Sequence, residues 1–253
     1  MMNRIKYITF ILFLSAVIPQ SFFTPGEKLN YSAGFRFFSA GLASIEVLTD
    51  TLNNVPVYQF ISTTRSAGIL DKFYKVRDEI DVWVSSEDFR LIRMNKKIRE
   101  GHYKKDFNAT IDWEKQVATM GSKVLPLPHK VMDPVSAIYY FRTKDLKIGD
   151  VYSFTSFDNG KIKDIQVTVT HEETISVPAG IFRCWVLSPS SPDGTELLKN
   201  QGEMTIWYTK DERKLPAKIE QTTSLGSMIL ELKEVIVPLL DEPGDVIEHD
   251  KNK

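Results

Sequence analysis

The sequence predicts an all-β protein, a large antiparallel meander curled into a half-barrel or open barrel, with one short helix near residues 133–143. Apolar and polar residues alternate along several runs, and residues that favour tight turns separate these runs. A good helix start at Asp133-Pro134 predicts the one helix. Short connections make sequential strands antiparallel neighbours, so we expect a single β-rich domain over residues 23–240.

The first 22 residues are predicted to be a secretory signal outside this domain. Arg4 and Lys6 form a short positive stretch, and twelve nearly unbroken apolar residues follow from Tyr7 to Ile18 before a polar break. Twelve apolar residues are too few to span a bilayer core of about 30 Å comfortably as a helix. We therefore expect cleavage within residues 16–23 and export to the periplasm. An uncleaved membrane anchor and a buried N-terminal helix are the alternatives.

The charge and the cysteine content limit the partners and cross-links of the mature chain. The formal charge is −1, and it becomes −3 once Arg4 and Lys6 leave with the signal. Nucleic-acid binding needs a basic surface, so nucleic acid is not an expected partner. Cys184 is the only cysteine, so no internal disulfide can form and the core must hold the fold.

Alternation of apolar and polar residues predicts the strands. Between residues 103 and 113 the odd positions carry Tyr, Lys, Phe, Ala, Ile and Trp, whereas the even positions carry Lys, Asp, Asn, Thr and Asp. This is the pattern of a half-buried strand whose odd side chains face the core. The same alternation marks the runs 31–37, 76–84 and 165–170. Such one-sided strands are typical of antiparallel sheets.

Short turn sequences lie between these runs. Asn53-Asn54 and Asn159-Gly160 accept positive φ at low steric cost and are expected to close two-residue hairpins. Pro178-Ala179-Gly180 suits a tight turn that reverses the chain between residues 177 and 181. Further turns are expected at Glu100-Gly101, Asp193-Gly194 and Leu225-Gly226. Strands that follow one another along the chain should therefore pair.

One segment departs from the strand pattern and predicts the helix. Asp133 is a good N-cap, Pro134 suits the first helical position, and apolar residues then recur at helical spacing. We expect this helix to pack on the sheet through Ile138 and Tyr139 or Phe141. A weaker signal predicts a helical turn within residues 66–73.

Two charged stretches lie apart from the predicted core. The segment 241–253 contains few apolar residues and is predicted to be a disordered polar tail. Basic residues cluster on both sides of the turn at residues 100–101, where they are expected to form a solvated hairpin tip; contact with anionic lipid headgroups is the alternative. These basic residues are Lys96, Lys97, Arg99, Lys104 and Lys105.

Four stretches together resemble a family. They are Gly-Glu-Lys-Leu-Asn-Tyr at 26–31, Asp-Pro-Val-Ser-Ala-Ile-Tyr-Tyr-Phe-Arg at 133–142, Val-Pro-Ala-Gly-Ile-Phe-Arg-Cys at 177–184, and Ile-Trp-Tyr-Thr at 206–209 with Arg-Lys-Leu-Pro-Ala-Lys at 213–218. In this order and spacing they resemble a widespread family of bacterial exported proteins of unknown function, over residues 24–236. The stretches combine a turn, a helix cap and strand aromatics, which are expected to specify the fold rather than a binding site.

The resemblance implies a Gram-negative periplasmic or outer-membrane-facing location, a β-rich fold and no established activity. It assigns no catalytic residue. In architecture alone, a long curved sheet with a short helix on one side is similar to the periplasmic lipoprotein carriers, whose concave face holds acyl chains.

Few residues in the chain have the spacing that catalysis or metal binding requires. Cys184 lies in an apolar run, where a thiol is expected to be a buried hydrophobe with a raised pKa. The histidines, His102, His129, His171 and His249, do not have the spacing of metal ligands. We therefore predict no catalytic residue, no metal site and no cofactor.

The aromatic residues suggest a binding role. Several strands carry aromatic residues on both faces, and such a strand is either buried between layers or lines a cavity. A closed core and a hydrophobic groove for an acyl chain are both consistent with this pattern. The candidate ligand-binding residues are Phe35, Phe37, Trp83, Trp207 and Tyr208.

These observations lead to one expected function and two alternatives. The expected function is a non-enzymatic binding or carrier protein of the cell envelope, whose partner is a hydrophobic, lipid-like ligand and which meets the membrane only through its N-terminal signal. One alternative is an envelope hydrolase acting on glycan or lipid, using acidic residues or His171 on a rim. The other is a structural scaffold that pairs through an edge strand.

Overall fold

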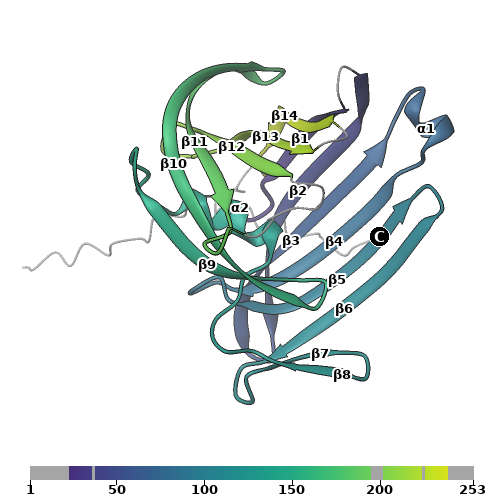
Figure 1. The fold of residues 1–253 in the computed structure, drawn as a ribbon, viewed down its shortest axis with the longest axis vertical. Helices are drawn as coiled ribbons and strands as arrows, with labels where there is room; N and C mark the ends of the chain where they lie inside the picture. Colours follow the sequence, from purple (N-terminus) through teal and green to yellow (C-terminus); the bar gives the residue numbers. More distant parts are fainter. Residues whose placement is uncertain (1–22, 36–37, 195–201, 224–225, 239–253) are drawn as a thin grey trace, which may run out of the picture.

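The strands form one sheet that curls around a short helix (Figure 1). The computed structural model describes residues 23–35, 38–194, 202–223 and 226–238. The predicted signal at 1–22 and the predicted tail at 241–253 lie outside this part of the chain, as does Phe37.

Fourteen strands and two helices make up the described part of the chain. The strands are β1 (Lys28–Phe35), β2 (Phe38–Leu52), β3 (Val55–Ser66), β4 (Arg77–Ser85), β5 (Leu91–Glu100), β6 (Tyr103–Asp112), β7 (Val117–Met120), β8 (Lys123–Pro126), β9 (Val151–Asp158), β10 (Lys161–Val177), β11 (Gly180–Ser190), β12 (Glu203–Thr209), β13 (Pro216–Thr223) and β14 (Gly226–Ile236). The helices are α1 (Leu70–Phe73) and α2 (Pro134–Arg142). Neither of these two helices has the length and apolar character needed to cross a membrane.

The sheet consists of two antiparallel meanders joined by the first and last strands. Its order is β8-β7-β6-β5-β4-β3-β2-β1-β14-β13-β12-β11-β10-β9. Lys28 of β1 pairs with Ile236 of β14, which joins the two meanders. Because β8 and β9 form the two ends of the order, the sheet is open. The prediction of a large antiparallel meander curled into an open barrel is therefore confirmed.

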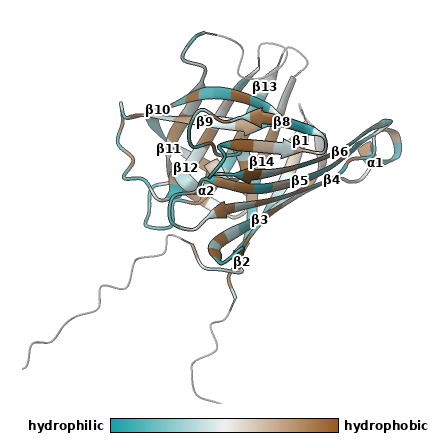
Figure 2. Ribbon diagram, turned by 90° about the horizontal axis from the view of Figure 1, so that it is seen from below, coloured by the Kyte–Doolittle hydropathy of each residue, from teal (hydrophilic) through white to brown (hydrophobic). Residues whose placement is uncertain are grey.

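Local sequence signals account for several strand boundaries. Asn53 and Asn54 have φ of 51° and 64° and close the β2–β3 hairpin, while Asn159 and Gly160, at 51° and 74°, close β9–β10. Both pairs occupy the left-handed region that two-residue hairpins require. Along the strands, apolar and polar bands alternate, as Figure 2 shows. The hairpin turns predicted at Asn53-Asn54 and Asn159-Gly160 are therefore confirmed.

A short segment before α2 bridges β5 of one meander and β9, the last strand of the other. The Leu91 amide at the start of β5 donates to the Val131 carbonyl at 2.9 Å. The next residue, Met132, donates to Thr155 of β9 at 2.9 Å and accepts from Phe157 of β9 at 2.8 Å. The connection between the meanders therefore spans the opening of the half-barrel.

Helix α2 lies within the curve of the sheet (Figure 1), and its buried apolar side chains belong to two hydrophobic clusters. Its Tyr139 side chain is fully buried against Phe60 and Phe23, with ring centroids 4.7 Å and 5.2 Å away. Phe141 belongs to a second cluster around Tyr208. Full burial of such a side chain stabilises a fold by about 1.5–3 kcal/mol. Tyr139 and Phe141, which were alternative predictions for the residue that packs on the sheet, therefore both pack in the core.

The predicted cap starts α2. The Asp133 carboxylate accepts hydrogen bonds from the Val135 amide at 2.7 Å and from the Ser136 amide at 3.1 Å, and also from the Ser136 hydroxyl. These bonds satisfy amides that have no partner inside the helix. Burial raises the pKa of Asp133, while the bonds from Ser136 and Val135 oppose that rise. The helix begins at Pro134, as its sequence predicts.

Candidate functional site

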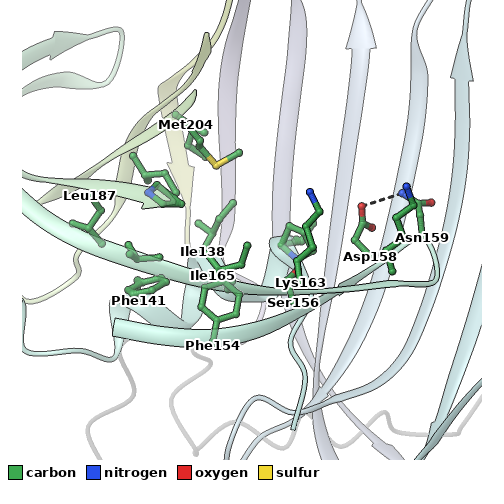
Figure 3. A pocket seen from close by; sticks show the side chains of 18 of the residues that line it. Ile138, Phe141, Phe154, Ser156, Asp158, Asn159, Lys163, Ile165, Leu187 and Met204 are labelled. Carbon is green, nitrogen blue, oxygen red and sulfur yellow. Dashed lines mark hydrogen bonds between the residues drawn. The ribbon is translucent and has the colours of Figure 1, made fainter. Parts of the chain in front are cut away.

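A cavity of about 520 Å³ lies between α2 and the concave face of strands β9 to β13 (Figure 3). Helix α2 contributes Ile138 and Phe141 to its wall. The facing strands contribute further apolar side chains, namely Phe154, Ile165, Val167, Leu187, Met204, Ile206 and Ile219. The volume falls within the range of about 300–1,000 Å³ typical of ligand pockets, which are mainly apolar with a few polar groups.

The residues of β10 that line the cavity change from charged to apolar along the strand. Lys161, Lys163, Ile165 and Val167 all line the cavity. They are alternate residues, so they lie on one face of the strand. Lys161 and Lys163 are exposed, whereas Ile165 and Val167 are buried. One end of the cavity is therefore cationic and the other apolar.

The cationic end is built where the β9–β10 hairpin meets β5 and β6. The Asp158 carboxylate pairs with Lys96 of β5 and accepts from the Asn159 side-chain amide at 3.0 Å (Figure 3). The Lys105 ammonium of β6 donates to Asn159 Oδ1 at 2.9 Å. Lys96 is only 7% exposed, so the prediction of a solvated basic hairpin tip is wrong for this residue. These bonds hold the hairpin tip against the opposite meander.

A buried ion pair fixes the helix that walls the cavity. The Arg142 guanidinium donates to both carboxylate oxygens of Glu27, at 2.5 Å and 3.2 Å, and both side chains are buried. Arg213 reaches the same carboxylate at 3.3 Å. The Tyr208 hydroxyl donates to the Ile138 carbonyl at 3.0 Å. Helix α2 is therefore tied to the segment before β1, to the β12–β13 connection and to β12.

The four sequence stretches that carry the family resemblance build this arrangement. Residues 26–31, 133–142 and 213–218 meet at the ion pair, and Tyr31 donates to the Pro216 carbonyl at 3.0 Å. Within 177–184, the Pro178-Ala179 turn joins β10 to β11. The stretches hold the helix inside the sheet, which agrees with the prediction that they specify the fold.

Of the candidate aromatic residues, the four that the structure describes, Phe35, Trp83, Trp207 and Tyr208, are not among the residues that line this cavity, and Phe37 lies outside the described residues. Phe35 is 39% exposed at the end of β1, and Trp83 lies beneath the Arg93 guanidinium, 5.2 Å from the ring. Trp207 is buried and donates to Glu173 at 2.7 Å. Tyr208 is buried and reaches α2. A ligand-binding role for these residues stays a prediction, while the cavity lining includes lysines and aliphatic residues that the sequence reasoning missed.

The described histidines lie in three separate segments of the chain. His102 follows β5 in the turn to β6, His129 precedes α2, and His171 lies on β10 beside Thr170, with its Nδ1 2.9 Å from the Thr170 hydroxyl. Among the described residues, no three His, Cys, Asp or Glu side chains are grouped to hold a metal ion. His249 lies outside the described residues.

A smaller cavity of about 320 Å³ includes His129, Thr155 and Asp164. The Thr155 hydroxyl donates to Asp164 Oδ1 at 2.7 Å, and His129 Nε2 lies 2.5 Å from the same hydroxyl oxygen. Because the hydroxyl has a single proton, which it donates to Asp164, the contact with His129 requires the tautomer in which Nε2 carries a proton and donates it to the hydroxyl oxygen.

Cys184 has the properties that its sequence surroundings predict. The thiol is buried, and burial is the main cause that raises its pKa to about 12. A thiol of this kind is a poor nucleophile, because the thiolate is the reactive form.

Two solved structures from bacteria are among those to which this chain is similar. A β-barrel-like protein of the domain of unknown function DUF1849 from Brucella abortus is 11% identical, with a TM-score of 0.54 over 83% of this chain and 96% of that one. A protein with a YmcC-like fold from Bacteroides fragilis is 13% identical, with a TM-score of 0.35 over 85% of this chain and 99% of that one. At this identity the first likeness concerns the fold alone.

The family is established by sequence. No curated protein matches the chain. The family model described as Protein of unknown function (DUF3108) matches residues 30–233, which is most of the chain and includes most of the four stretches. The chain therefore belongs to the DUF3108 family of proteins of unknown function.

Proposed function

We propose that the protein is an exported binding or carrier protein of the bacterial envelope that holds a hydrophobic, lipid-like ligand between α2 and the concave face of the sheet. The observation that carries this proposal is the cavity of about 520 Å³ with its mainly apolar lining. The predicted secretory signal supports an extracytoplasmic site of action.

The energetics favour an apolar occupant. Moving a methylene group from water into an apolar site is worth about 0.8 kcal/mol, so an acyl chain placed along this wall gains several kcal/mol. The wall includes buried side chains such as Phe141, Ile165 and Leu187. Binding to a preformed wall avoids the cost of ordering it, and the Arg142–Glu27 pair and the Tyr208–Ile138 bond hold α2 in place.

A pair of matched variants tests the proposal. Met204 of β12 lines the cavity, whereas Met228 of β14 does not line it and is 44% exposed. Met204→Trp should narrow the cavity and weaken binding of a neutral, apolar fluorescent dye at least tenfold. Met228→Trp adds the same side chain elsewhere and should leave the affinity unchanged.

Two results would count against this function. One is a wild-type protein that does not bind the dye at any concentration tested. The other is equal affinity in the wild type and Met204→Trp, since the dye would then occupy a different surface. Circular dichroism of both variants establishes that each is folded.

A further inference from the structure

We infer that the connection between β3 and β4 docks the protein on an anionic membrane surface by inserting Ile69 and Phe73 among the lipids. Residues 65–78, which contain α1, are called the α1 tip. Such docking does not depend on an occupied cavity. It differs from the expectation that the chain meets the membrane only through its N-terminal signal.

The α1 tip exposes large apolar side chains. Ile69 is 76% exposed and Phe73 is 83% exposed, the highest values among the large hydrophobic residues that the structure describes. Ile69 has helical φ and ψ, so these two residues, four apart, lie on the same side of the helical turn. No residue of α1 is buried, and α1 lies at the outer end of the sheet (Figure 2). Adjoining apolar side chains in such a position are typical of a surface that contacts a membrane or a protein.

Polar contacts hold the α1 tip against the neighbouring strands. The Asp71 carboxylate accepts from Arg77 Nη1 at 2.7 Å and Nη2 at 3.0 Å, and the Ser66 hydroxyl donates to it at 2.5 Å. The Gly101 amide of the β5–β6 turn donates to the Lys75 carbonyl at 2.8 Å. The acidic side chain of α1 is therefore directed toward β3 and β4, while the apolar ones stay exposed. A surface held in this way loses little conformational entropy on docking.

The charge of the α1 tip favours an anionic membrane over a neutral one. The structure describes every residue from 65 to 78, and this segment contains four basic and two acidic residues, a net charge of +2. Lys72 and Lys75, which flank Phe73, are both exposed. Lysine and arginine close to a membrane surface are attracted by anionic head groups. The basic residues are Arg65, Lys72, Lys75 and Arg77, and the acidic residues are Asp71 and Asp78.

The β5–β6 turn extends this surface. It lies beside the α1 tip, because Val76 forms a β-bridge with Glu100. Residues 99–106 are all described and contain three basic and two acidic residues, a net charge of +1. Tyr74 of the tip is 46% exposed, and Tyr103 at the start of β6 is 53% exposed. Tyrosine, with an apolar ring and a polar hydroxyl, suits the boundary between lipid and water. Apolar, aromatic and basic side chains together favour binding at an anionic bilayer interface.

Vesicle binding tests the inference. Two kinds of vesicle are compared, one of phosphatidylcholine alone and one of phosphatidylcholine and phosphatidylglycerol in equal parts. We expect the full-length mature protein to bind the mixed vesicles at least tenfold more tightly than the neutral ones, as measured by co-sedimentation. This preference should shrink as salt is added, because exposed charges are screened.

A double variant of the apolar residues tests the insertion. Ile69→Ser with Phe73→Ser should weaken binding to the mixed vesicles at least tenfold, because the apolar area that enters the lipid is lost. The matched control, Ile148→Ser with Ile181→Ser, changes side chains that are 58% and 75% exposed outside the tip and should bind like the wild type. Circular dichroism establishes that both double variants are folded.

A second double variant assigns the preference for anionic lipid. Lys72→Gln with Lys75→Gln should reduce the advantage of the mixed vesicles to less than threefold. The matched control, Lys123→Gln with Lys233→Gln, removes two exposed lysines outside the tip and should keep the full preference.

Three results would overturn the inference. The first is wild-type protein that binds neither kind of vesicle, and the second is equal binding to both kinds. The third is a serine double variant, Ile69→Ser with Phe73→Ser, that binds the mixed vesicles like the wild type. The proposed function would stand in each case, because the apolar dye reports on the cavity and not on the α1 tip.

Discussion

The Arg142 guanidinium and the Glu27 carboxylate form a buried ion pair, with Nη1 and Oε1 2.5 Å apart, although 115 residues separate them in the chain. The pair joins the last turn of α2 to the segment before β1. The helix is thereby fixed inside the curve of the sheet, where it forms one wall of the cavity.

Removing one partner of this pair should be costly. Arg142→Met leaves the buried Glu27 carboxylate with only the partly exposed Arg213 at 3.3 Å, and loss of one member of a buried pair costs about 3–5 kcal/mol. Urea unfolding of the variant should show a decrease of this size in the free energy of unfolding. The matched control is Lys147→Gln, which breaks an exposed pair with Asp145 and should change stability by less than about 1 kcal/mol.

The double variant Arg142→Met with Glu27→Leu extends this test. Removing both charges should recover part of the lost stability, because no buried charge is then left without its partner. If Arg142→Met unfolds at the wild-type urea concentration, the ion pair does not hold the helix.

The Tyr208 hydroxyl supplies a second tie to α2. Tyr208→Phe removes its bond to the Ile138 carbonyl and should lower the free energy of unfolding by about 1–2 kcal/mol. Tyr103→Phe, at a side chain that is 53% exposed, should leave stability within about 0.5 kcal/mol of the wild type. Equal effects of the two variants would argue against a structural role for the Tyr208 bond.

The ion pair between Asp71 of α1 and Arg77 of β4 predicts a pH dependence of stability. Hydrogen bonds from Arg77, first, and from Ser66 lower the pKa of Asp71 to about 2. A carboxyl whose pKa is lowered in the folded state stabilises the fold at pH values above its ordinary pKa of 3.8. This stabilisation is lost as the pH falls through the lowered pKa of about 2. Asp71→Asn should therefore be less stable than the wild type at pH 6, with a difference that shrinks between pH 4 and 2.

Urea unfolding at several pH values measures this dependence, and Arg77→Gln should reproduce it because the same pair is lost. A constant difference from pH 6 to 2 would exclude Asp71 as the titrating group.

Cys184 predicts a chemical property of the folded state. Because the thiol is buried and its pKa is raised to about 12, iodoacetamide at pH 8 should leave it unmodified in the native protein. In 8 M urea the same reagent should modify it fully, with mass spectrometry as the readout. Complete modification without denaturant would show that the strand pair β11–β12 opens readily.

Local features of the fold could be predicted from the sequence because each depends on neighbouring residues. The cap of α2 needs only Asp133 and the two amides that follow it closely. The turn at Asn53-Asn54 needs only residues that tolerate positive φ. Apolar and polar residues alternate along β6 because one face of the strand is exposed to solvent and the other faces the core. Ala109 and Ile111 are accordingly buried.

Features that depend on how the sheet curls could not be predicted. Lys96 follows the polar pattern of a hairpin, yet it is buried because Asp158, 62 residues later, supplies its counter-charge. The pairing of β1 with β14 likewise depends on contacts between the two ends of the domain. Lys161 and Lys163 gain their position at the cavity only when β10 faces α2.

The surroundings of the aromatic residues also depend on contacts between distant parts of the chain. Trp207 and Tyr208 are adjacent and both buried, as two-faced burial of β12 predicts. Their partners, Glu173 and the Ile138 carbonyl, are distant in sequence and give both side chains hydrogen bonds within the protein. The cavity is lined by aliphatic side chains of several strands, whose hydrophobicity alone does not distinguish a cavity wall from a filled core.

The most direct test of a ligand-holding cavity is native mass spectrometry of the mature protein, secreted by a Gram-negative host and purified without detergent, followed by solvent extraction. We predict a lipid-like molecule bound at about one per chain in the wild type and in Met228→Trp, and absent from Met204→Trp. Wild-type protein that carries no such molecule, and that takes none up from envelope lipid extracts, would contradict the account.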